Sequence, residues 1–193
     1  MLLDILKQFN WLDVFIVILL IRICYIAFSS GFTIEFFKLV GTLAAIYLPM
    51  HYYTQLSDWA VRFLPLPKDN VPLEFIDFVC FLLLAVTGYC IFMAVRVVFY
   101  RFIQLKAVPN LNMWGGLILG AARGFLLAGL ITFMLVISSI SYLKKSAINS
   151  YSSKYLLNVA PGTYSFLWKG LFSKFMTSEE ENKTVLEIQG SIK

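Results

Sequence analysis

Four long apolar blocks alternate with short polar segments along this chain of 193 residues. They run from Trp11 to Phe28, from Phe32 to Leu48, from Phe75 to Tyr100 and from Trp114 to Tyr142. Each block has at least the roughly 17 residues that a helix needs to cross a bilayer. Only 14% of the residues are charged, against about 25% in a soluble domain. The sequence therefore predicts an all-α membrane protein with four transmembrane helices.

The short breaks between these blocks predict two antiparallel hairpins within a membrane domain of residues 1–145. Ser29-Ser30-Gly31 separates the first two blocks, and Pro49 closes the second. Asn10 is the expected N-cap of the first helix, with Asp13 near a capping-box position. Four spans place both termini and the 50–74 loop on one side of the membrane. No small-residue cleavage site follows the opening residues, so no cleaved signal peptide is expected.

Two further segments have the pattern of short amphipathic helices that lie in the membrane interface. The first covers residues 54–64, and the second covers residues 162–176 in a polar tail of residues 146–193. In the second, Tyr164, Leu167, Trp168, Leu171, Phe172 and Phe175 recur at helical spacing. Its lysines occupy the other face, which is typical of an interfacial helix. The charged residues 177–193 are expected to be mobile.

Five charged residues fall within the half of the spans nearest the two short loops: Arg22, Glu35, Lys38, Arg96 and Arg123. A charge in a membrane costs about 2.5–3.5 kcal/mol on insertion scales, so each is a functional candidate. Lys38 can pair with Glu35 at i,i+3. This half contains four cations and one anion. Either Glu35 bridges the cations, or lipid phosphates or a bound anion neutralise the remaining positive charge. Asp13 and Asp77 are interpreted as helix-capping carboxylates rather than as an acid pair.

Small residues recur every four positions in the fourth block, at Gly116, Gly120, Gly124 and Ala128. Such a row forms a smooth groove that lets another helix approach closely. The groove fits either a helix of the same chain or a helix of a neighbouring molecule.

Recognisable catalytic, cofactor and metal motifs are absent from the sequence. His51 is the single histidine and is expected to be a polar residue of a loop, so a two-histidine metal site within one chain is excluded. There is no G-x-S-x-G elbow and no Walker loop. The scattered basic residues, with a net charge of +5, favour contact with the lipid bilayer over nucleic acid. We therefore predict a protein that is not an enzyme.

Two ordered motifs resemble those of a known family. The first is Asn10-Trp11-Leu12-Asp13 followed by Gly31-Phe32 and Glu35, and the second is Gly116, Gly120, Arg123 and Gly124 in a G-x-x-x-G-x-x-R-G pattern. Over about residues 10–142 the chain resembles the colicin V production protein family of bacterial inner-membrane proteins. Here Ser29-Ser30 replaces a basic pair common in that family, and Arg22 is a cation that its members usually lack.

The resemblance implies a multi-pass inner-membrane protein linked to colicin V production and envelope homeostasis. The leading hypothesis is a non-enzymatic scaffold or accessory factor, which acts as a homo-oligomer or with another envelope protein. The alternative is a small oligomeric channel or carrier for an anionic or polar solute. A carrier requires Arg22 and Arg123 to face a common water-accessible cavity, whereas a scaffold buries them in satisfied pairs.

The distribution of cations leaves the orientation balanced. Six loop cations lie on the side of the termini and two on the side of the short loops, and the four embedded cations make the totals equal. The positive-inside rule alone therefore does not decide. Related proteins have basic short loops, a bias that Arg96, Arg101 and Lys106 preserve here. On that resemblance, both termini are expected in the periplasm.

Overall fold

The computed structural model describes residues 10–63, 72–102, 109–177 and 179–191. Four long helices dominate it, α2 (Trp11–Ser30), α3 (Phe32–Phe63), α4 (Leu73–Phe102) and α5 (Pro109–Ile137). Each contains a stretch long and apolar enough to cross a membrane. Shorter elements follow, namely α6 (Ser141–Asn149), α7 (Ser153–Leu156), α8 (Val159–Gly170), η1 (Phe172–Lys174) and α9 (Lys183–Ser191). The prediction of an all-α protein with four spans is confirmed.

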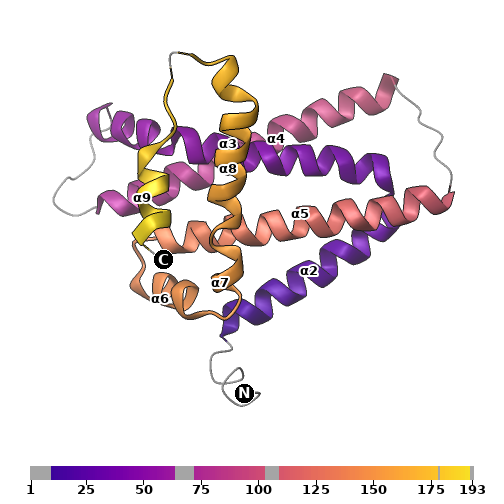
Figure 1. The fold of residues 1–193 in the computed structure, drawn as a ribbon, viewed down its shortest axis with the longest axis horizontal. Coiled ribbons are helices and arrows are strands. Elements are labelled where there is room, and N and C mark those ends of the chain that lie inside the picture. Colours follow the sequence, from indigo (N-terminus) through magenta and orange to yellow (C-terminus); the bar gives the residue numbers. More distant parts are fainter. Residues whose placement is uncertain (1–9, 64–71, 103–108, 178, 192–193) are drawn as a thin grey trace.

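The contacts give the order α4, α3, α5, α2 for the long helices, and Figure 1 shows α3 and α4 crossing, with α5 and then α2 on one side of that pair. α3 packs extensively on α4 and α5, whereas α2 packs along α5 and contacts α3 only slightly. The arrangement as two self-packed hairpins is therefore not confirmed. Hydropathy and loop length mark the spans, but the pairing of helices depends on which faces are complementary in shape.

The turn between α2 and α3 depends on Gly31, which has a φ of 82°. This left-handed backbone conformation favours glycine. A Cβ at Gly31 would also collide with the side chain of Asn112 at the start of α5. The Asn112 carboxamide oxygen accepts a hydrogen bond from the Phe32 N–H at 2.8 Å. Asn112 thus ties the first short turn to the fourth span.

α3 continues through Pro49 to Phe63, so the predicted separate interfacial helix at residues 54–64 is wrong for its described part. Proline removes one backbone hydrogen bond, but neighbouring helices allow a spanning helix to tolerate this loss. Here Pro49 is buried, and the adjacent Met50 packs in the main apolar core. Residue 64 lies outside the described residues.

The fourth span ends at Ile137, five residues before the predicted end. Just beyond it, the Ser138 hydroxyl accepts a hydrogen bond from the Ile140 N–H at 3.2 Å. Serine side chains compete with helical hydrogen bonds in this way. The chain then turns into α6, which begins at Ser141.

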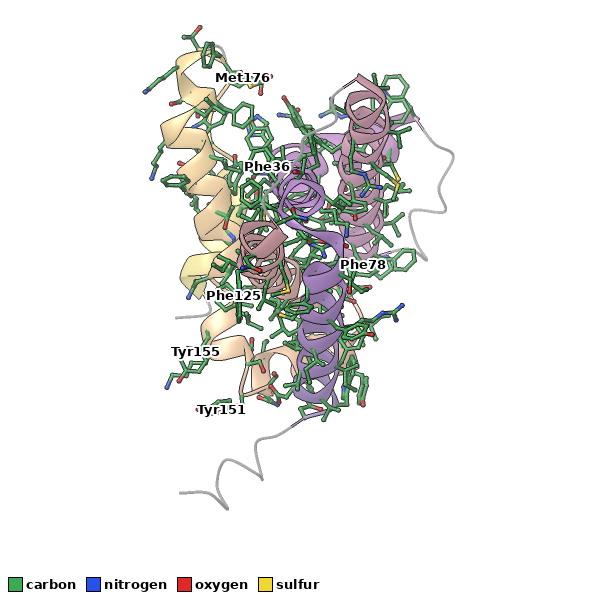
Figure 2. All side chains as sticks on the ribbon, turned by 90° about the vertical axis from the view of Figure 1, so that its right-hand side faces the viewer. Phe36, Phe78, Phe125, Tyr151, Tyr155 and Met176 are labelled. Atoms are coloured by element: carbon green, nitrogen blue, oxygen red, sulfur yellow. The ribbon has the colours of Figure 1, made fainter. Side chains whose placement is uncertain are left out.

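The predicted amphipathic segment at residues 162–176 corresponds to α8 and η1, with the helix beginning at Val159. α8 crosses α3 and α5 in Figure 1, and its buried residues Ala160, Tyr164 and Trp168 join Tyr47 and Met50 in the core. Figure 2 shows the segment from Tyr151 through Tyr155 to Met176 along one side of the bundle. The apolar face of α8 therefore packs on the other helices.

The end of the tail is more ordered than predicted. Residues 183–191 form α9, in which Val185 is fully buried against the main core. A charged segment with one apolar stripe can fold when a neighbouring surface covers that stripe.

Candidate functional site

An intramembrane ion cluster joins Glu35 and Lys38 of α3 to Arg123 of α5. The Lys38 ammonium lies 2.5 Å from Glu35 Oε1, and Arg123 Nη2 lies 3.0 Å from Glu35 Oε2. Lys38 also donates to the Ser30 hydroxyl at 3.2 Å. Glu35 is fully buried and Arg123 is 6% exposed. Glu35 thus bridges two of the cations that the sequence places in this half of the bilayer.

The Glu35–Arg123 contact is an electrostatic pair rather than a directed hydrogen bond. Both Glu35 Oε2 and Arg123 Nε are buried, and neither has a hydrogen-bond partner among the described residues. Charges removed from water are stabilised by an opposite charge only when the pair stays close. The cluster can therefore fix how α3 and α5 dock.

The row of small residues on α5 receives α2 of the same chain. A Cβ at Gly116 would lie 2.9 Å from the Ala27 carbonyl oxygen, and one at Gly120 would overlap the Ala27 Cβ. Gly124 faces Leu20 and Ile23, and Ala128 is fully buried. Close backbone approach of this kind drives association of helices in a bilayer.

Gly120 also makes room for the ion cluster. A Cβ at this position would lie 3.5 Å from Glu35 Oε2, in addition to overlapping Ala27. The two sequence motifs, far apart along the chain, therefore meet at one junction of α2, α3 and α5. Of their residues, Gly31, Glu35, Gly116, Gly120, Arg123 and Gly124 lie at this junction.

The other two cations of the predicted cluster lie apart from it. Arg22 is exposed on α2, on the side opposite the residues that face α5. Arg96 is half-buried and lines a small crevice with Lys38 and Tyr89. Neither arginine has an ion-pair partner within the described ranges. The structure thus assembles three of the five predicted charges.

Asp13 forms a second polar site at the other end of α2. Its carboxylate completes the predicted capping box by accepting from the Asn10 N–H at 2.8 Å. It also accepts from the Ser150 hydroxyl at 2.6 Å and from the Ser152 N–H at 2.7 Å. Sequence reasoning missed both serines, although the serine-rich stretch after Lys145 was a signal of capping chemistry.

A third polar site surrounds His51, which lies buried within α3 rather than in a loop. The side chain of Glu179 lies 2.6 Å from His51 Nε2, and the Tyr164 hydroxyl lies 2.9 Å from Nδ1. Burial raises the pKa of Tyr164 to about 12, so its hydroxyl stays protonated. Asn182 donates from its side chain to the Met50 carbonyl at 2.9 Å. Together these contacts attach the tail to α3.

A cavity of about 460 Å³ opens where α4 begins, with Glu74, Asp77 and Lys144 in its wall. Tyr53 also lines it, and its buried hydroxyl has no hydrogen-bond partner in the described part of the chain. The volume is that of a small-molecule site. Neither Arg22 nor Arg123 lines this cavity, so it is not the shared path that a carrier using both arginines requires.

Comparison with known proteins identifies one family. The family model described as colicin V production protein matches residues 12–161, which is most of the chain. No curated protein and no solved structure matches the chain. The matched region contains the ion cluster, the glycine groove and Asp13. The chain therefore belongs to the colicin V production protein family.

Proposed function

We propose that this chain is a non-enzymatic scaffold or accessory factor that supports toxin production or export and envelope homeostasis. The burial of Arg123 against Glu35, instead of along a water-accessible path, carries this proposal. Embedded charges that serve transport normally line a cavity or path. Family membership supports it as well, because the colicin V production family is not a known enzyme family.

The production role is tested by deleting the family member of a colicin V-producing bacterium and supplying this chain in its place. The chain is expected to restore toxin in the medium, and Gly120→Leu is expected to lower it because that substitution opens the α2–α5 contact. Ala122→Leu, at an exposed position of the same helix, is the matched control. If the wild-type chain is present in the membrane but does not restore toxin in the medium, the result argues against the production role.

A reconstitution experiment separates a scaffold from a transporter. Proteoliposomes that contain the chain are expected to show no more phosphate or chloride flux than empty vesicles. The Arg123→Ala variant is expected to show no flux above that level either. Solute flux that disappears in Arg123→Ala contradicts the scaffold proposal.

We also propose that the chain lies in the bacterial inner membrane with both termini in the periplasm. The resemblance of the short-loop side to the basic cytoplasmic loops of the family supports this orientation. A C-terminal reporter that is active only in the periplasm tests it. If the fusion is well expressed but gives no signal, the termini lie in the cytoplasm and the proposed orientation is wrong.

A further inference from the structure

One face of α2 is covered by no other described part of the chain. Leu20, Ile23 and Ala27 face the glycine groove of α5. On the opposite side, Ile18 is 60% exposed and Tyr25 is 76% exposed. Figure 1 shows α2 at the edge of the bundle, with α5 as its neighbour. This face therefore meets lipid or another protein.

Arg22 lies in the middle of that open face. It is 11 residues after Trp11 and eight before Ser30, which at 1.5 Å per residue is about 16 Å and 12 Å from the two ends. Its side chain is exposed and has no ion-pair or hydrogen-bond partner within the residues that the structure describes. An unpaired arginine at this depth costs about 2.5–3.5 kcal/mol or more, so something must compensate it.

Lipid phosphates lie too far away to be that partner. An extended arginine side chain reaches roughly 7 Å from its Cα, which is less than either distance to the helix ends. The Cα–Cβ bond also tilts toward the helix N-terminus, which is the more distant end. The guanidinium therefore stays below the headgroups unless the bilayer thins around it, and a carboxylate within the bilayer is the partner that reaches it directly.

A second copy of this chain is poorly suited to supply that charge. Among the described residues of the spans, Asp13 and Glu35 are buried and already paired. Asp58 lies near the end of α3, and Glu74 and Asp77 lie near the start of α4, so all three are at the other end of the bundle from the short turns. If the open α2 faces of two copies packed together, the Arg22 side chains of the two copies would face each other and repel. The partner must be a different molecule.

We infer that the open face of α2 docks a transmembrane helix of another membrane protein, which carries an aspartate or glutamate at mid-depth. The carboxylate pairs with Arg22, and apolar side chains pack against Ile18, Tyr25 and their neighbours. This inference rests on the position of Arg22 and does not depend on a role in toxin production.

Model peptides test the inference with the full chain in vesicles of zwitterionic lipid. The probe is a leucine–alanine helix of about 20 residues with one central glutamate, and its matched control has glutamine there. Energy transfer between a donor on the chain and an acceptor on the peptide reports binding at pH 8. The glutamate peptide is expected to bind about tenfold more tightly than the glutamine peptide.

Substitutions of Arg22 assign that preference. Arg22→Gln is expected to reduce the ratio of the two peptide affinities, glutamate over glutamine, to about one. Arg22→Lys and Arg96→Gln are expected to keep the wild-type ratio. Arg22→Glu is expected to prefer a peptide with a central arginine. Equal binding of the glutamate and glutamine peptides by the wild-type chain overturns the inference. Binding that follows the fraction of anionic lipid, and not the peptide carboxylate, also overturns it and makes Arg22 a lipid contact.

Discussion

Arg123 Nη2 lies 3.0 Å from Glu35 Oε2, and this contact joins the middle of α5 to the first turn of α3. Glu35→Gln removes the anion and leaves Arg123 buried without a counter-charge. We expect the free energy of unfolding in detergent to fall by about 3–5 kcal/mol. Replacing all three charges of the cluster, in Glu35→Leu with Lys38→Leu and Arg123→Leu, should recover most of the loss because none of them then remains unpaired. Stability equal to wild type in Glu35→Gln alone contradicts this role.

Gly120→Leu places a branched side chain where α2 already touches α5. Overpacking of this kind costs about 1–3 kcal/mol, so the melting temperature in detergent should fall. Ala122→Leu, on the exposed side of the same helix, should leave it within the error of the wild type. If Gly120→Leu changes neither the melting temperature nor the oligomer size, the groove does not hold the two helices together.

Asp13→Ala should release the start of the tail from α2. The substitution leaves the Ser150 hydroxyl and the Ser152 N–H without their acceptor, at a cost of about 3 kcal/mol. Limited proteolysis near residues 150–152 should become faster, and Asp58→Ala, at an exposed position, serves as the control. Unchanged cleavage in Asp13→Ala means that other contacts hold this segment.

Glu179→Ala should loosen α9, because Glu179 contacts both His51 and Tyr52. Amide exchange in residues 183–191 is expected to become about tenfold faster, which corresponds to roughly 1.4 kcal/mol. Glu180→Ala removes only an exposed pair with Lys183 and should have little effect. Equal exchange in the two variants rules out the attachment through His51.

The sequence predicts local features of this fold better than contacts between distant segments. The four spans and the Asn10 cap depend on hydropathy and on neighbours within one turn, and both appear in the structure. Continuation of α3 through Pro49 was missed because proline statistics from water-exposed helices overestimate its cost inside a bundle.

The candidate site was predictable in its residue types and only partly in its geometry. Glu35 and Lys38 are three residues apart on one helix, so their pairing follows from helical geometry. Which arginine joins Glu35 and Lys38 depends on the faces of α2 and α5 that meet. The sequence shows only that Arg22 and Arg123 lie in the same half of the bilayer, and this alone grouped them in one cluster. The contacts of Asp13 and His51 with the tail involve residues more than 100 positions away, for which a single sequence contains no local signal.

The pairing of the first span with the fourth has a consequence for biosynthesis. Ala27 cannot meet Gly120 until the ribosome has made the chain between them, which takes about 5–20 s at ordinary elongation rates. During that interval the α2 surface that faces α5 in the finished protein has no α5 to cover it. The first helix must therefore remain inserted by its own hydropathy, and the contact with α5 forms only after the last span has entered the membrane.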